Sequence, residues 1–242
     1  MPVRRRPAFF ALTFALTVAP IGPTVPRAHA ARPMITDDAR VVDEKACQLE
    51  SWVRRNRDTT EYWALPACNF GFDTEITLGG ARTSDADGTH ASDMLAQAKH
   101  VWRSLERTGW GSGIAVGYAS KPALPQVRDL LGDAYAYLVN SFSFVDGRAL
   151  LHTNVGGAHV REQHANRLIW GVGGELQLSQ RVWLIAETFG QSANRPLWQA
   201  GARVWLVPDR VQVDATVGNR WSSGDERWMS IGLRLLSPPF LP

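Results

Sequence analysis

The sequence has few cysteines, few lysines and no long apolar run. Only two of its 242 residues are cysteines, but a chain of this length is far above the size at which folding needs disulfide bonds. Four of the 26 basic residues and none of the 23 acidic ones lie in the first 30 positions, which leaves 22 basic and 23 acidic residues beyond them. This balance argues against a general nucleic-acid or anionic-membrane binder. A hydrophobic content of 45% argues against a disordered chain.

The N-terminus has the layout of a secretory signal peptide. Met1–Pro7 is short and basic, Ala8–Val18 is mostly apolar, and Ala28-His29-Ala30 is a small-x-small cleavage site. The apolar run is too short for the roughly 20 residues of a transmembrane helix. We therefore predict a signal peptide over residues 1–30, export of the chain, and no lipid anchor, because no cysteine follows the cleavage site.

The body of the chain alternates between apolar and polar residues with period two, which predicts strands. In residues 211–217, for example, Val, Val, Ala and Val alternate with Gln, Asp and Thr. Residues 91–106 fit a short helix equally well. The pattern predicts twelve strands, near residues 46–55, 59–70, 73–84, 92–105, 111–120, 133–145, 148–161, 167–178, 182–190, 196–207, 210–221 and 226–237.

Short and long connections partly alternate along these strands, as in outer-membrane barrels with tight periplasmic turns and longer outer loops. The strands are also longer than usual, and Trp110, Trp198, Trp221 and Trp228 lie near strand ends like an interfacial girdle. We predict that residues 46–242 form an all-β, antiparallel, up-and-down transmembrane β-barrel of about 12 strands in a bacterial outer membrane. A soluble sandwich or lipocalin-like barrel is the alternative.

Two tight turns allow the strand register to be predicted. If Cys47 and Cys68 are cross-strand partners, the hairpin centre falls in a polar turn, and Arg54 lies opposite Glu61 and Trp52 opposite Trp63. In an oxidising compartment an isolated cysteine pair usually forms a disulfide, and two free buried thiols are the alternative.

The turn at Pro208-Asp209 gives a second register. It places Arg203 opposite Asp214 and Leu206 opposite Val211, so that one face is apolar and the other carries a charge pair.

Extending the pairing across the longer loops predicts a row of charges in the lumen. Asp214 then lies opposite Arg234 and Arg203 opposite Glu187, with Glu175 on the next strand. Arginines that face lipid at mid-depth would cost about 2–4 kcal/mol each, so these side chains should face inward. They form either a structural ion-pair network or a constriction that selects ions or substrates. Residues 31–45 either hang in the periplasm or fold into the lumen.

Other chemistries are weakly supported. Ser141 and His152 would lie opposite each other, as a barrel lipid hydrolase requires, but no third group is placed to orient the histidine. No histidines have metal-ligand spacing on one face. We therefore predict no catalytic residues, no metal, no cofactor and no enzyme activity. The expected partners are outer-membrane lipid, the barrel-assembly machinery and a small-molecule solute, with no nucleic acid. A sealed barrel whose loops, 121–132 especially, contact partners is the second hypothesis.

Both ends of the chain resemble one group of Gram-negative outer-membrane proteins. Residues 32–52, RPMITDDARVVDEKACQLESW, are similar to the start of transporters of the meta-pathway-of-phenol-degradation type, and residues 204–236 are similar to their end. The resemblance implies a barrel that takes up small molecules, hydrophobic ones among them, and it brings no catalytic residues. The chain differs from the common pattern of outer-membrane barrels because residues 238–242 do not end on an aromatic residue.

Overall fold

The structure is a computed structural model that describes residues 34–85, 88, 90–106, 108–120, 133–161, 163–222 and 226–241. The predicted signal peptide and loop 121–132 lie outside the described residues.

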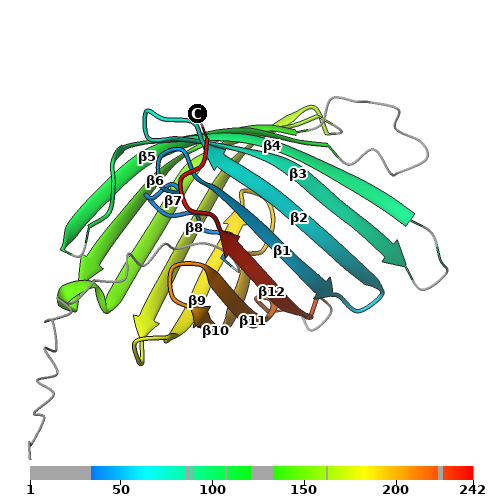
Figure 1. Ribbon diagram of the computed structural model, residues 1–242. Helices are drawn as coiled ribbons and strands as arrows, with labels where there is room; N and C mark the ends of the chain where they lie inside the picture. The colour runs from blue at the N-terminus through cyan, green and yellow to red at the C-terminus, as the bar shows by residue number, and fades with distance from the viewer. Residues whose placement is uncertain are drawn as a thin grey trace, which may run out of the picture.

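Twelve strands form a closed barrel in which each strand pairs antiparallel with the next, and β1 closes the barrel against β12 (Figure 1). The predicted up-and-down barrel is confirmed. The helical alternative for residues 91–106 is wrong, because β4 covers most of them. The strands are β1 (Cys47–Arg55), β2 (Thr59–Asn69), β3 (Thr74–Asp85), β4 (His90–Arg103), β5 (Gly109–Ser120), β6 (Asp133–Phe144), β7 (Ala149–Val160), β8 (Ala165–Gln177), β9 (Val182–Gln191), β10 (Leu197–Val207), β11 (Val211–Arg220) and β12 (Trp228–Leu236).

The described residues include one short 3-10 turn, η1 (Val145–Gly147), between β6 and β7. None of their helical segments is long and apolar enough to cross a membrane.

The barrel has a polar interior and an apolar exterior. On β12, Ser230 and Arg234 are buried, whereas Met229 and Ile231 are 60% and 70% exposed. Alternate residues of a strand point to opposite faces, so the ionised side chains point into the barrel and the aliphatic ones away from it. A water-soluble barrel has the opposite arrangement, which argues against the lipocalin-like alternative.

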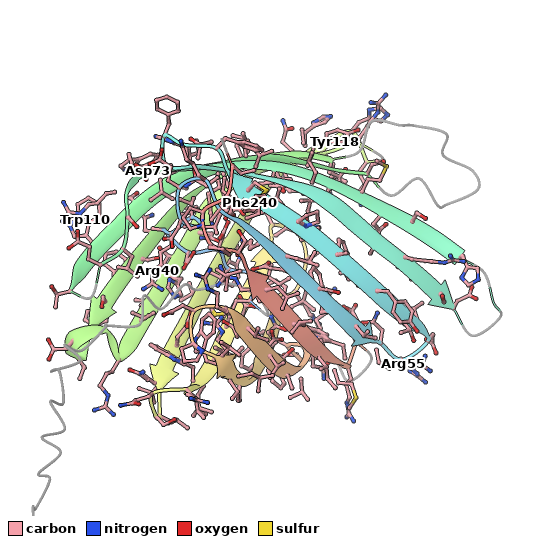
Figure 2. The ribbon with its side chains drawn as sticks, in the orientation of Figure 1. Arg40, Arg55, Asp73, Trp110, Tyr118 and Phe240 are labelled. Carbon is pink, nitrogen blue, oxygen red and sulfur yellow. A yellow bond between two sulfur atoms is a disulfide. The ribbon has the colours of Figure 1, made fainter. Side chains whose placement is uncertain are left out.

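The two ends of the barrel differ in what they carry. Figure 2 shows Asp73, in the β2–β3 turn, and Phe240, after β12, at one end and Arg55 at the other. We call the first the terminal end, since β1 begins and β12 ends there, and the second the loop end.

The first hairpin has the predicted register. Cys47 lies opposite Cys68, Arg54 opposite Glu61 and Trp52 opposite Trp63. The two cysteines form a disulfide, with Cα atoms 4.0 Å apart, and the two indole rings stack with centroids 5.1 Å apart.

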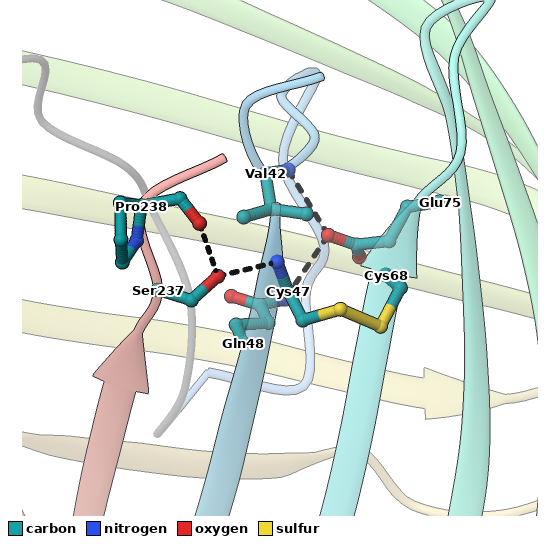
Figure 3. The surroundings of a disulfide bond; sticks show 7 residues. All are labelled: Val42, Cys47, Gln48, Cys68, Glu75, Ser237 and Pro238. Atoms are coloured by element: carbon teal, nitrogen blue, oxygen red, sulfur yellow. Dashed lines mark hydrogen bonds between the residues drawn. A yellow bond between two sulfur atoms is a disulfide. The ribbon is translucent and has the colours of Figure 1, made fainter. Parts of the chain in front are cut away.

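The disulfide lies beside the β1–β12 closure of the barrel (Figure 3). The Cys47 backbone N–H donates to Ser237 Oγ at 2.9 Å, and Ser237 Oγ donates to the Pro238 carbonyl at 2.8 Å. The Phe240 N–H bonds the Lys45 carbonyl at 2.8 Å. These bonds attach the chain that follows β12 to the start of β1. The disulfide joins the same end of β1 to β2.

The second tight turn has the predicted register up to a bulge. Arg203 lies opposite Asp214, but a register shift between Trp205 and Val207 places Val207, and not Leu206, opposite Val211. An extra residue on one strand is the definition of a β-bulge, and the sequence symmetry about the turn does not reveal it.

The registers predicted across the longer loops are wrong. Gln212 lies opposite Arg234, and Asp214 lies opposite Gly232. On the other side of β10, Arg203 lies opposite Trp183, and Gln199 lies opposite Glu187. Both errors are even-numbered slips, so each charge keeps its inward direction, because only an odd slip moves a side chain to the other face.

Candidate functional site: the barrel lumen

A stretch of chain ahead of β1, residues 34–46 (the N-terminal segment), enters the barrel. Its residues 36–42 are buried or half-buried there, whereas residues 43–45 are exposed. Its backbone donates hydrogen bonds to strand side chains. Ile35 N and Thr36 N each donate to a Glu187 carboxylate oxygen at 2.7 Å, and Ala39 N donates to Ser141 Oγ at 2.9 Å. Side chains of β6 and β9 thus supply partners to buried backbone groups that have no sheet ladder.

The wall also binds backbone carbonyls of the N-terminal segment. The amide of Asn154 accepts from Asp37 N at 2.7 Å and donates to the Asp37 carbonyl at 2.9 Å. Asn69 Nδ2 donates to the Val42 carbonyl at 2.8 Å, and Leu105 N donates to the Ala39 carbonyl at 3.0 Å. The wall thus supplies acceptors for backbone N–H groups of the N-terminal segment and donors for its carbonyl groups. These bonds hold the segment in one position in the lumen.

Figure 3 shows the terminal-end part of this attachment. A Glu75 carboxylate oxygen accepts from Val42 N at 3.0 Å and from Gln48 Nε2 at 3.1 Å. The N-terminal segment, β1 and β3 therefore meet on one buried carboxylate.

Two glycines of β8 leave room for the N-terminal segment. A Cβ at Gly171 would lie 2.6 Å from Thr36 Oγ1, and a Cβ at Gly173 would collide with the Met34 methyl group. A side chain at Gly171 would press on Thr36, and one at Gly173 would push the end of Met34 aside and crowd Thr36, so both glycines keep space for this part of the segment.

Lys99 of β4 is a further attachment. Its ammonium lies 2.8 Å from Asp37 Oδ1 and 3.7 Å from Asp38 Oδ1. The Arg40 guanidinium lies 3.9 Å from the Asp38 carboxylate. Burial raises the pKa of Asp38 despite the nearby Lys99 and Arg40, and burial lowers the pKa of Arg40. Taking both groups out of water therefore outweighs their mutual attraction.

The five predicted lumen residues all lie inside, but they do not form one row. Glu187 binds the N-terminal segment, Arg203 pairs with Glu175 at 2.6 Å, and Arg234 Nε lies 3.6 Å from Glu50. Asp214 lies over the space left by Gly232. Their exposed fractions are 3% for Glu175, 6% for Glu187, 2% for Arg203, 5% for Asp214 and 2% for Arg234.

The prediction that no third group orients His152 is wrong. Ser141 Oγ lies 2.8 Å from His152 Nδ1, and His152 Nε2 lies 3.2 Å from Glu175 Oε1. Strand pairing places Gly173 opposite His152, so Glu175 reaches the ring diagonally. A search for directly opposite partners misses such a contact.

This Ser-His-Glu row is an attachment point and not an exposed site. Ser141 and His152 are fully buried, and Ser141 Oγ accepts the Ala39 N–H of the N-terminal segment. Arg203 completes the row by its bond to Glu175. The row therefore links four strands to the segment that covers it.

Two cavities of about 370 Å³ each flank the N-terminal segment. The first, the β1–β4 cavity, is lined by Asp37, Glu75, Lys99 and Arg234 among others. The second, the β8–β9 cavity, is lined mainly from β8, β9 and the chain that follows them. Both have Ile35, Thr36, Tyr137 and Ile169 in their walls, so the segment stands between them.

The lumen shows no metal centre among the residues that the structure describes, since no three His, Cys, Asp or Glu side chains are grouped to hold an ion.

The family comparison accounts for nearly the whole chain. The model of the family described as "Uncharacterised conserved protein UCP029691" matches residues 18–236. The chain belongs to that family. No curated protein matches the chain. The match does not confirm the phenol-degradation transporter type that the two ends of the chain resemble.

Solved structures similar to this family member are outer-membrane barrels. The KdgM porin is 8% identical with a TM-score of 0.57, and the match covers 78% of this chain and 98% of that chain. The KdgM porin in complex with disordered oligogalacturonate has the same identity and coverage with a TM-score of 0.59. The COG4313 outer membrane channel from Pseudomonas putida F1 is 10% identical with a TM-score of 0.57, covering 83% of this chain and 98% of that chain. At such identities the likeness shows the fold alone.

Proposed function

We propose that this protein is an outer-membrane barrel that passes or binds small solutes and is closed at rest by its own N-terminal segment. The observation that carries the proposal is the polar, ionised interior within an apolar exterior. An arginine facing lipid at mid-depth costs about 2–4 kcal/mol, whereas Arg203 and Arg234 lie inside, and Met229 and Ile231 face outward. The strands, of 9 to 14 residues, are long enough for tilted strands to cross a bilayer.

The proposal includes export through a signal peptide over residues 1–30, with the terminal end in the periplasm and the loop end outside. A periplasmic terminal end places the disulfide in an oxidising compartment. It also lets the N-terminal segment enter the lumen from the side on which the chain begins β1.

Passage requires the N-terminal segment to move, because Ile35 and Thr36 stand between the two cavities. Among the five predicted lumen residues, Arg234 is in the wall of the β1–β4 cavity. We therefore assign ion preference to the groups around that cavity, Arg234 among them. Arg203 and Glu175 serve as a structural ion pair.

The similar solved structures, a porin and an outer membrane channel, support the channel class. One of them was solved with oligogalacturonate, which is a property of that protein. The resemblance of both chain ends to phenol-degradation transporters favours small, hydrophobic solutes. We propose the class of small solutes and no single compound.

Conductance of the refolded chain in planar bilayers tests this function. We expect infrequent ohmic current steps from the chain with its N-terminal segment in place and frequent ones once the segment is released. We expect Arg234→Gln to shift ion preference toward cations, because it removes a positive charge from the cavity wall. Arg55→Gln, at an exposed position of the loop end, is the control. Silence from a demonstrably folded barrel, with and without release of the N-terminal segment, would overturn the proposal.

A sealed barrel that acts through its loops is the second candidate. The dense bonding of the N-terminal segment to side chains of the wall favours it, since a permanent plug would bond in the same way. In that case the loop deletion Δ121–132 would abolish partner contacts while lumen variants would have no effect.

A further inference from the structure

The β8–β9 cavity has an apolar body. Ile35, Ile169, Phe189 and Leu197 contribute aliphatic and aromatic walls, and Tyr137 adds its ring. A volume of about 370 Å³ is within the range of small-molecule sites, which are mostly apolar with a few convergent polar groups.

The charged groups in the wall of this cavity are both positive. Arg195 lies in the β9–β10 loop, and Arg220 ends β11, so both are at the loop end. None of the described residues in its wall is Asp or Glu, although the β1–β4 cavity has four such residues, Asp37, Asp38, Glu50 and Glu75. The two cavities thus differ in charge while sharing a wall.

The two arginines are held in place by backbone contacts. Arg195 Nη1 donates to the Ser222 carbonyl at 3.2 Å, and Arg220 Nη1 donates to the Arg195 carbonyl at 2.6 Å. A guanidinium carries five N–H donors, so these bonds fix each group and leave it able to bind a carboxylate. Arg220 also pairs with Glu226 at 2.6 Å. Glu226 is half exposed, and an exposed pair of this kind is readily exchanged for another anion.

We propose that the β8–β9 cavity binds an amphipathic organic anion, with its apolar body between Ile169 and Phe189 and its carboxylate or sulfonate at Arg195 and Arg220. A body of about eight to fifteen non-hydrogen atoms suits a cavity of this size. This proposal adds a class of solute to the proposed function. It rests on that function for the passage of the bound solute through the barrel. The occupant touches Ile35 and Thr36, so it reaches the N-terminal segment directly.

Three probes with one apolar body test the assignment: octanoate, 1-octanol and octylamine. Each is titrated by calorimetry into the full chain in lipid nanodiscs, with empty nanodiscs subtracted. We expect octanoate to bind at least tenfold more tightly than octylamine, with 1-octanol in between. Arg195→Gln combined with Arg220→Gln should weaken octanoate at least tenfold and change 1-octanol less than twofold.

A second variant and a control complete the test. Ile169→Trp fills the apolar body and should weaken all three probes, whereas Arg55→Gln should leave all three unchanged. Equal binding of the three probes, or octanoate binding unaffected by the double arginine variant, would overturn the proposal. Calorimetry measures binding of the probes and does not depend on whether the barrel conducts. A barrel that conducts but does not prefer octanoate contradicts this inference alone, and one that binds octanoate without conducting contradicts the channel function alone.

Discussion

Glu187→Gln should loosen the N-terminal segment without unfolding the barrel. The carboxylate accepts backbone N–H groups from Ile35 and Thr36, both at 2.7 Å. A glutamine can present its oxygen to one of them, but its NH₂ group then faces the other, so one charge-assisted bond is lost and one is weakened. Hydrogen bonds to charged groups contribute about 1.5–3 kcal/mol each, so we expect a loss of about 2–3 kcal/mol in the free energy that seats the segment. At 1.4 kcal/mol per factor of ten, the released fraction rises about 30-fold to 150-fold.

Hydrogen–deuterium exchange of a peptide covering residues 34–42 measures this release. Its protection should fall by the same factor in Glu187→Gln, while peptides of β11 and β12 keep theirs. Glu61→Gln is the matched control, because Glu61 accepts from Asn56 and Trp63 near the loop end and does not touch the segment. Unchanged protection of residues 34–42 in a folded Glu187→Gln protein would refute the reasoning.

Three further predictions concern the disulfide, the buried carboxyl of the segment and the buried ion pair. Replacing Cys47 and Cys68 by serine removes a cross-link over 21 residues and should lower the free energy of unfolding by about 3 kcal/mol, seen as a lower thermal midpoint; an unchanged midpoint contradicts this. Because burial raises the pKa of Asp38 above its ordinary 3.8, its protonation stabilises the seated segment fully below that pH and less as pH rises through the raised value. Exchange protection of residues 34–42 should therefore fall with rising pH, and Asp38→Asn should flatten the dependence; a profile identical in both proteins would exclude Asp38 as its source. Arg203→Met should cost about 3–5 kcal/mol of unfolding free energy by leaving the buried Glu175 without its guanidinium partner, and adding Glu175→Gln should recover part of it. No recovery in the double variant would show that the pair is not the cause.

Tight turns made part of this fold predictable. The centre of the first hairpin and of the Pro208-Asp209 turn fixes which residues face each other, so the cysteine pair and the Arg203–Asp214 pair follow from counting. Loops such as 192–196 do not fix a centre, and the registers across β9–β10 and β11–β12 were wrong by even slips. Alternation still specified which side chains face inward, because that depends on parity and not on register.

The site was harder to predict than the barrel. The lumen contacts of Glu175, Glu187 and Lys99 run diagonally or to the N-terminal segment, and pairing of opposite residues cannot reveal them. The segment has no periodic pattern that would place it in the lumen. One signal is the pair of adjacent acids, Asp37 and Asp38, which need cations if they are buried. Gly171 and Gly173 were a second signal, since two inward glycines on one strand leave a space that another part of the chain must fill.

The measurement that tests the central claim most directly is single-channel conductance of Gly173→Val beside the wild-type chain. The Cβ of a valine there would meet the Met34 methyl group and lie 3.4 Å from Thr36 Cβ and 3.3 Å from Glu187 Cβ. The two further methyl groups of valine leave no room for Thr36 beside Glu187, so the N-terminal segment should be displaced, and we expect larger or more frequent current steps. Gly174→Ala is the control, because a Cβ there meets only the Leu150 carbonyl, at an ordinary 3.6 Å. Identical conductance of Gly173→Val, Gly174→Ala and wild type, all shown to be folded, would contradict a lumen closed by its own N-terminal segment.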